Sequence, residues 1–198
     1  MLLPNGSIGP SAVDVDRISP TVRPRQRRVM FQRWAQLLFL HWVVPAEIIQ
    51  GRLPPGLTLD TYEGKAYVGL VPFTMTGVRP VWAPAVRHLS DFHEINVRTY
   101  VHREGKDSGV WFFSLDAANA AAVRLARAWY RLPYHFARMS MALEPGAEGP
   151  ARSIQYETER LWPGPTPAGA SIRYSVGDTP PTPAAPGTLE HFLAERYI

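Results

Sequence analysis

The sequence predicts an α+β fold, mainly antiparallel β, built as one domain. Segments rich in β-branched and aromatic residues recur along most of the chain, and turn residues separate several of them at hairpin distances. Only one long segment has a clear helical period. The chain has 198 residues, of which 45% are hydrophobic, so it holds enough apolar material for a folded core.

The chain divides into a tail and a domain. Residues 1–28 are predicted to be a disordered tail that is basic and contains proline, and residues 29–198 a single domain. Residues 1–26 carry Pro, Gly, Ser and Asp without a period, and apolar residues become frequent from Val29. The final segment ends on apolar side chains, which normally pack on something that follows. We therefore expect the domain to lack its C-terminal strands.

The first half of the domain is predicted to be mostly strands. Residues 34–44 form either a strand buried on both faces or a short buried helix, because periodicity alone does not separate the two. A short helix is expected within residues 44–57, ended by Gly51 and by Pro54–Pro55. Further strands are predicted at 57–62, 66–76, 91–103 and 109–115, joined by turns at Tyr62–Gly64 and Arg103–Gly109.

The second half begins with the clear helix, predicted over residues 117–130. Asp116 is placed to cap this helix, and arginines recur on it at spacings of three and four. Pro133 ends the pattern. Strands are then predicted at 136–144, 152–161 and 170–176, followed by a proline-rich loop at 177–187 and an amphipathic helix within 187–198.

Composition excludes several classes of protein. There is no cysteine, hence no disulfide, thiolate nucleophile or cysteine-ligated zinc. No segment approaches the roughly 18 consecutive apolar residues of a membrane-spanning helix, and the start does not resemble a signal peptide, so a cytoplasmic location is expected by default. The net charge is +4 and the basic residues are mostly arginine, a skew that does not by itself indicate nucleic-acid binding.

Common cofactor and catalytic motifs are missing from the sequence. It has no phosphate-binding G-x-x-x-x-G-K-[ST] loop, no G-x-G-x-x-G and no G-x-S-x-G, which argues against nucleotide-cofactor enzymes and standard serine hydrolases. No histidine pair has the spacing of H-E-x-x-H. His93 and Glu94 are neighbours on a predicted strand and therefore point to opposite faces. We expect neither a metal nor a cofactor.

Two segments carry candidate site residues. In the strand 91–101, alternation places five side chains on one face: Phe92, Glu94, Asn96, Arg98 and Tyr100. This row either lines a polar pocket, in which the arginine holds a carboxylate and the glutamate handles a proton, or is an ordinary solvent-facing surface. At the helix-to-strand corner, Arg127, Tyr134 and His135 either form the rim of a site or plug the corner.

The segment Met30–Met141 resembles the YqjF-like family of uncharacterised bacterial proteins, which belongs to the acetoacetate decarboxylase-like superfamily. The resemblance rests on these segments, in order: LPPGL at 53–57, AYVGLVPFTM at 66–75, FHEINVRTYV at 92–101, GVWFFSLDA at 109–117 and ARAWYRLPYHFARM at 126–139. It implies an acetoacetate decarboxylase-like curved sheet that closes toward a barrel around a small cavity, with a few flanking helices. Members of the superfamily often assemble, so a homo-oligomer is also an expectation.

The resemblance also bears on chemistry. Superfamily members that decarboxylate β-keto acids form a Schiff base with a lysine, and the corresponding positions here hold Tyr134 and His135, which form no imine. Glu94 matches a superfamily glutamate, and Arg33 matches the arginine that meets the substrate carboxylate. The resemblance therefore implies the scaffold without imine-dependent decarboxylation.

The leading hypothesis is a pocket for a small organic acid. Its candidate catalytic residues are Glu94, Tyr134 and His135, and its candidate ligand-binding residues are Arg33, Asn96, Arg98 and Arg127. Any enzyme activity would be that of a lysine-independent lyase, isomerase or hydrolase. Two alternatives stay open: a non-catalytic binding or assembly protein whose cavity is packed core, and a nucleic-acid or membrane-surface binder acting through the basic segment 23–33.

Overall fold

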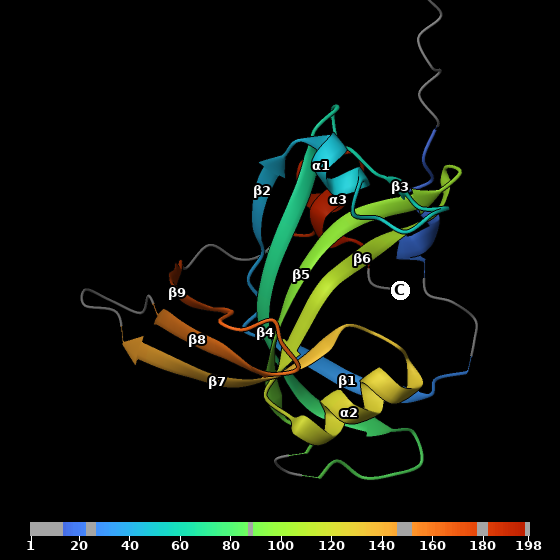
Figure 1. The fold of residues 1–198 in the computed structure, drawn as a ribbon. Helices are drawn as coiled ribbons and strands as arrows, with labels where there is room; N and C mark the ends of the chain where they lie inside the picture. The colour runs from blue at the N-terminus through green and yellow to red at the C-terminus, as the bar shows by residue number, and fades with distance from the viewer. Residues whose placement is uncertain (1–13, 23–26, 87–88, 146–151, 178–181, 197–198) are drawn as a thin grey trace, which may run out of the picture.

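The computed structural model describes residues 14–22, 27–86, 89–145, 152–177 and 182–196 (Figure 1). Its strands are β1 (Met30–Ala35), β2 (Leu40–Val44), β3 (Thr58–Leu59), β4 (Ala66–Pro80), β5 (Phe92–Arg103), β6 (Lys106–Ala117), β7 (Tyr134–Pro145), β8 (Arg152–Trp162) and β9 (Gly169–Val176). Its helices are a short 3₁₀ turn η1 (Ser19–Thr21), α1 (Ala46–Gln50), α2 (Ala120–Trp129) and α3 (Leu189–Ala194).

All nine strands belong to one sheet with the order β1-β4-β5-β6-β7-β8-β9, in which β2 also pairs with β4 and β3 with β5. Every pairing is antiparallel except that of β6 with β7, which are parallel because α2 carries the chain back between them. The mainly antiparallel α+β fold predicted from the sequence is therefore confirmed. Within the described ranges, β9 makes no ladder with β1 or β2, so the sheet is curved but not closed.

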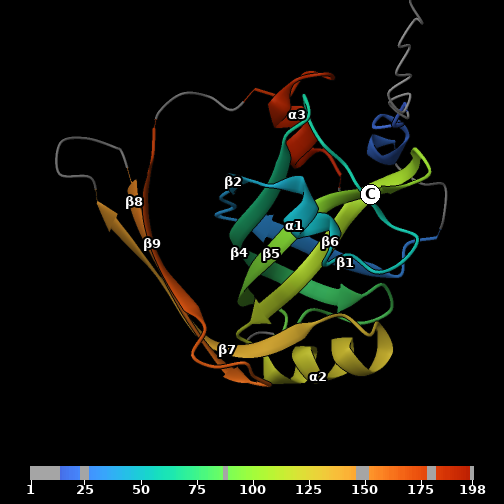
Figure 2. The same cartoon turned by 45° about the horizontal axis from the view of Figure 1, so that its top comes forward.

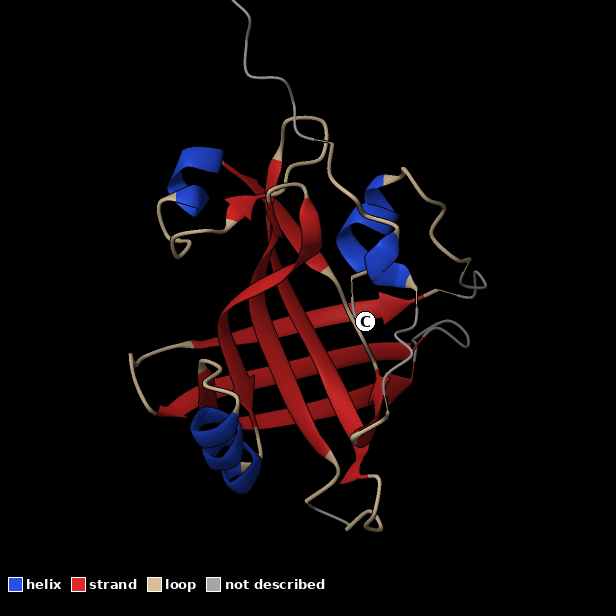
Figure 3. Ribbon diagram, turned by 90° about the vertical axis from the view of Figure 1, so that its right-hand side faces the viewer, coloured by secondary structure: helices blue, strands red, loops and turns tan. Residues whose placement is uncertain are grey.

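The strands form two groups that lie across one another. β7, β8 and β9 swing away from the long strands β4, β5 and β6 and cross them steeply (Figures 2 and 3). α2 lies at the end of the sheet where β7 begins, whereas α1 and α3 lie near β2 at the other end. The two groups touch through Tyr156 of β8, whose hydroxyl donates to the backbone carbonyl of Glu94 at 3.0 Å. None of the described helices is long and apolar enough to cross a membrane.

The segment predicted as one strand or helix at 34–44 is two strands. β1 ends at Ala35 opposite Thr74, and β2 begins at Leu40 opposite Leu70, so both lie in succession along the same edge of β4. Pro72 lies between these two stretches and has no N–H to donate to the ladder. The strand is interrupted between Ala35 and Leu40, where Gln36 adopts a φ of 48°. The prediction of burial on both faces is wrong, because much of β2 is exposed.

The predicted cap of the main helix is also wrong. Strand β6 continues to Ala117, and α2 begins at Ala120. The cap is Asn119, whose side-chain oxygen accepts a hydrogen bond from the N–H of Ala122 at 3.0 Å. Asp116 is instead buried in β6, where it binds the guanidinium of Arg160 at 2.7 and 2.9 Å. The Asp116 carboxylate therefore pairs with Arg160, 44 residues away, and does not cap the helix.

Part of the predicted tail packs against the domain. Arg17 donates two hydrogen bonds to the carboxylate of Asp60, at 2.6 and 3.1 Å, and Ser108 donates to the carbonyl of Asp16 at 2.6 Å. Residues 14–22 thus belong to the folded body and differ from the disordered tail that was predicted. Residues 1–13 and 23–26 lie outside the described residues, and with them the first four residues of the basic segment 23–33, as do the last two residues of the chain.

Candidate functional site

The polar row of β5 lies inside the molecule. Glu94 is 2% exposed, Asn96 is 5% exposed, and Arg98 and Tyr100 are fully buried. β4 and β6 flank the strand, Phe39 and α3 lie over the Glu94–Arg98 face, and Tyr156 contacts His93 on the opposite face. The solvent-facing interpretation of this row is therefore wrong. Four polar side chains line an interior face instead.

At one end of the row, Glu94 is paired with a tyrosine. The hydroxyl of Tyr134, from the start of β7, donates to both carboxylate oxygens at 3.2 and 3.3 Å. Burial raises the pKa of Glu94 to about 8, although hydrogen bonds from Tyr134 and Asn96 act in the opposite direction. Burial and the neighbouring carboxylate raise the pKa of Tyr134, so the phenol keeps its proton. Glu94 is thus a mainly neutral acid at pH 7.

At the other end, Arg98 belongs to a second network. Its Nη2 donates to the Tyr100 hydroxyl at 3.2 Å and to the backbone carbonyl of Leu193 at 2.9 Å, and its guanidinium lies 5.2 Å from the centre of the Phe39 ring. The Tyr100 hydroxyl in turn donates to the Leu193 carbonyl at 2.6 Å. The interior cation is therefore held by aromatic rings and by the backbone of α3.

His41 of β2 completes this network. Its Nε2 is 2.7 Å from the Tyr100 hydroxyl. Burial, and then the charge of Arg98, lower the pKa of His41 to about 4, so the imidazole is neutral at pH 7. Gly69 makes room for it, since a Cβ at that position would lie 2.9 Å from His41 Nε2 and 3.5 Å from Arg98 Cγ. This close approach explains a glycine in the middle of a central strand.

Asn96 lies between the two ends of the row. Its side-chain oxygen is buried and has no hydrogen-bond partner among the described residues. Leaving a buried acceptor unsatisfied costs about 1–3 kcal/mol, which makes it an unusual feature of a packed interior. Glu94, Asn96 and Tyr134 thus lie together, with Arg98 on the same face of the same strand.

The other predicted site residues lie elsewhere. Tyr134 and His135 are consecutive residues of β7 and point to opposite faces, so the predicted grouping of both with Glu94 is wrong. His135 donates from Nδ1 to the carbonyl of Pro163 at 2.7 Å, and Arg127 donates to the carbonyl of Tyr134 at 2.6 Å. Both line a surface cleft at the corner between α2 and β7. Arg33 is exposed on β1 and is not part of the interior row.

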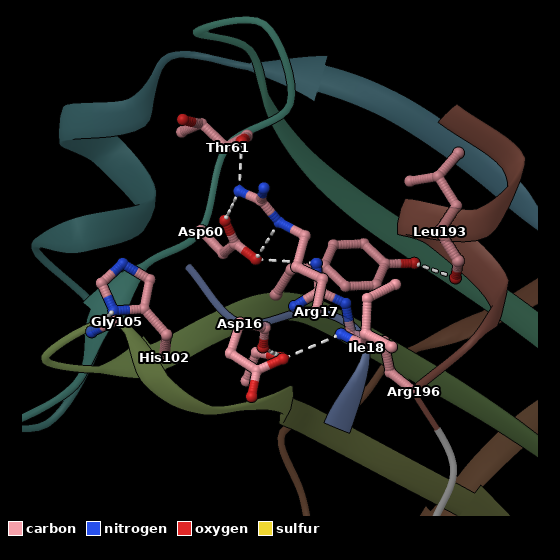
Figure 4. Close-up of polar contacts among 11 residues, drawn as sticks. Asp16, Arg17, Ile18, Asp60, Thr61, His102, Gly105, Leu193 and Arg196 are labelled. Carbon is pink, nitrogen blue, oxygen red and sulfur yellow. Dashed lines mark hydrogen bonds and ion pairs between the residues drawn. The ribbon is translucent and has the colours of Figure 1, made fainter. Parts of the chain in front are cut away.

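A buried ionic cluster was missed by sequence reasoning. Asp60, 1% exposed, receives Arg17 from the N-terminal segment and Arg196 from beyond α3, with the latter at 2.7 Å (Figure 4). Arg196 lies 4.6 Å from the centre of the Phe192 ring. The three charged residues come from opposite ends and the middle of the chain, so no local pattern could have indicated the cluster. Among the described residues, no three acidic or histidine side chains gather in a way that could hold a metal ion.

Neither lysine of the chain is near the interior row. Lys65 and Lys106 are the only two, and both are exposed at turns. The fold and the site thus define a curved, mainly antiparallel sheet whose interior face offers a neutral carboxylic acid and a guanidinium but no lysine amine. Imine formation by a lysine of this face is not available to the chain.

Comparison with known proteins places the chain in a family. Residues 31–198 match the family model DUF2071, described as an uncharacterized conserved protein, and the chain belongs to this family. It is 36% identical over 169 residues to the uncharacterized protein YqjF of Bacillus subtilis (strain 168), an alignment that covers 85% of this chain and 66% of the Bacillus protein. The chain thus spans slightly less than two thirds of that relative. The predicted YqjF-like resemblance is confirmed.

Solved structures share the fold. The enduracididine biosynthesis enzyme MppR, complexed with the condensation product of pyruvate and imidazole 4-carboxaldehyde, superposes with a TM-score of 0.52 at 15% identity, covering 89% of this chain and 68% of MppR. The acetoacetate decarboxylase of Legionella pneumophila gives a TM-score of 0.49 at 15% identity, covering 69% of this chain and 49% of the enzyme. The superposition on MppR shows that the chain shares the fold of this enzyme, a curved sheet as the resemblance implies.

Proposed function

We propose that the chain binds a small organic acid on the interior face of β5, with its carboxylate on Arg98 and its reacting end at Glu94. The observation that carries this proposal is the burial of the row Glu94, Asn96 and Arg98 on one face of the central strand. Within this row the buried oxygen of Asn96 has no hydrogen-bond partner among the described residues, which is more typical of a binding face than of a packing face.

The spacing of the row suits a short ligand. Glu94 and Arg98 are four residues apart on a strand, which separates their Cα atoms by about 13 Å. Both side chains are long, and they reduce the gap to one that a ligand of a few carbon atoms bridges. The guanidinium fork suits a carboxylate, and Asn96 offers its unsatisfied oxygen to a ligand hydroxyl or N–H between the two ends.

The chemistry available at Glu94 is proton transfer. With a pKa of about 8, the carboxyl group gains or loses its proton near neutral pH, whereas Tyr134 stays protonated and acts as a hydrogen-bond donor. Without an interior amine, the reactions this arrangement supports are lyase, isomerase or hydrolase steps that begin with a proton moving to or from Glu94. The MppR structure, in which the same fold holds a product made from pyruvate, supports keto acids as the first class to test.

The proposal is tested by thermal shift on the full chain with pyruvate, acetoacetate, lactate, benzoate and octanoate. A ligand at a hundred times its dissociation constant stabilises the folded state by about 2.7 kcal/mol, an increase of several degrees in melting temperature. Pyruvamide serves as the ligand control because it has the same shape as pyruvate but carries no carboxylate. We expect the shift with at least one acid and none with the corresponding amide.

Protein variants assign the site. Arg98→Gln is compared with Arg103→Gln, the same substitution at an exposed position of the same strand, and Glu94→Gln removes the ionisable proton with little change of shape. We expect Arg98→Gln to abolish the thermal shift and Arg103→Gln to leave it unchanged. No shift with any acid in a cooperatively melting protein overturns the proposal in favour of a packed interior. A shift that survives in a folded Arg98→Gln protein or in Glu94→Gln overturns the assigned site.

A further inference from the structure

A surface cleft lies on the outside of the molecule, where α2 runs into β7. It has a volume of about 540 Å³ and is lined by Arg127, Arg131, Leu132, Pro133, His135, Pro163 and Gly164. Because His135 points away from Tyr134, this corner cleft lies on the opposite face of β7 from Glu94. We propose that the corner cleft binds a small dianion, either a phosphate group or a dicarboxylate.

The charges around the corner cleft favour an anion. Two guanidinium groups and an imidazole line it, and no acidic side chain does. The carboxylate nearest in the ladder is Asp116, opposite His135, and it is already bound by both nitrogens of the Arg160 fork. The carboxyl end of α2 contributes the equivalent of roughly half a negative charge, which is less than the charge of the two arginines. A net positive charge remains for a ligand.

Two of the side chains that line the corner cleft are held in position before any ligand arrives. Arg127 donates from Nη1 to the Tyr134 carbonyl at 2.6 Å, and its guanidinium lies 5.7 Å from the centre of the Trp162 ring. The bond from His135 Nδ1 to Pro163 fixes the orientation of the imidazole. Arg127 keeps its remaining N–H groups for a second partner, since the guanidinium carries five. Fixed donors of this kind lose little entropy on binding an anion.

Arg131 supplies an independent argument. It follows the last turn of α2 with a φ of 54°, in the left-handed region that helix ends usually fill with glycine. An arginine in this conformation is strained, and strained residues concentrate at binding and catalytic sites. Its side chain lines the corner cleft. Arg131 thus occupies a position where glycine would be less strained, and it places a cation at the proposed ligand site.

This strain makes a decisive variant available. Arg131→Gly relieves the backbone and removes the cation, so it is expected to fold with a melting temperature equal to or above that of the parent chain. Isothermal titration calorimetry of the full chain uses inorganic phosphate and malonate as separate probes. We expect saturable binding of at least one probe, and a loss of roughly tenfold or more in its affinity in Arg131→Gly.

The controls separate this site from others. Arg124→Gln removes a cation from the exposed side of α2 without touching the cleft, and it is expected to keep the parent affinity. Binding of phosphate alone assigns a phosphate site, and binding of malonate alone assigns a dicarboxylate site. Absence of saturable binding for both probes overturns the proposal, as does an equal loss of affinity in Arg124→Gln and Arg131→Gly.

Discussion

Replacing Glu94 by glutamine should remove most of the pH dependence of stability between pH 6.5 and 8. In the folded protein the pKa of Glu94 is raised from 4.5 to about 8, first because the carboxyl is buried. The folded state therefore retains a proton that the unfolded state loses. When an acid's pKa is raised by folding, the free energy of unfolding falls as pH rises through that interval, here from about 4.5 to about 8.

The magnitude follows from the shift. Each pKa unit corresponds to about 1.4 kcal/mol, so the whole shift from 4.5 to about 8 represents on the order of 5 kcal/mol as an upper bound. His41, with its pKa lowered to about 4, has the opposite effect, because its stabilisation increases as pH rises toward 6.5. The two effects cancel in part below pH 6.5. Above pH 6.5 only Glu94 of these two residues still changes the free energy of unfolding, which is expected to fall by about 2 kcal/mol by pH 8.

Urea unfolding at pH 6.5, 7.25 and 8 measures this loss. The parent chain should become less stable across the series, whereas Glu94→Gln should give a nearly flat profile. Glu104→Gln, at an exposed turn residue of the adjoining hairpin, serves as the control and should follow the parent chain. Parallel profiles for the parent chain and Glu94→Gln would refute the argument that Glu94 is a neutral interior acid.

Three further predictions concern the surroundings of the site. Tyr134→Phe removes a hydrogen bond that lowers the pKa of Glu94, so the stability loss should extend to higher pH, as measured by the same urea series. Asp60→Asn leaves the buried Arg196 and the half-buried Arg17 without their carboxylate and should destabilise the fold by roughly 3–5 kcal/mol, seen in the unfolding midpoint. Gly69→Ala places a methyl group 2.9 Å from His41 Nε2 and should cost about 1–3 kcal/mol, and an unchanged melting temperature would contradict the close approach.

The sequence predicted which residues share a face of β5, because strand alternation is a local property. It did not predict whether that face is buried. The elements that cover it, Phe39 and α3 around Leu193, are distant in sequence from the strand. The burial of Arg98 is therefore a property of topology that no window around residue 98 contains.

Other errors have equally local causes. The sequence favours Asp116 as the helix cap, although Asn119 is an equally good cap three residues later. Only the distant Arg160, which binds Asp116, leaves Asn119 to cap the helix. His135 was grouped with Tyr134 because the strand was predicted to begin at residue 136. The structure begins β7 at Tyr134, so alternation already applies to the pair and separates them.

The most direct test of the account is the titration of the Glu94 carboxyl by ¹³C NMR, assigned by comparison with Glu94→Gln, without and with pyruvate. The account predicts a midpoint near 8 in the free chain and an upward movement with pyruvate, because a bound anion on the same interior face disfavours a second negative charge. A midpoint near 4.5 would contradict the neutral interior acid. A midpoint near 8 that pyruvate and each of the other acids in the thermal-shift series leave unchanged would contradict acid binding beside it.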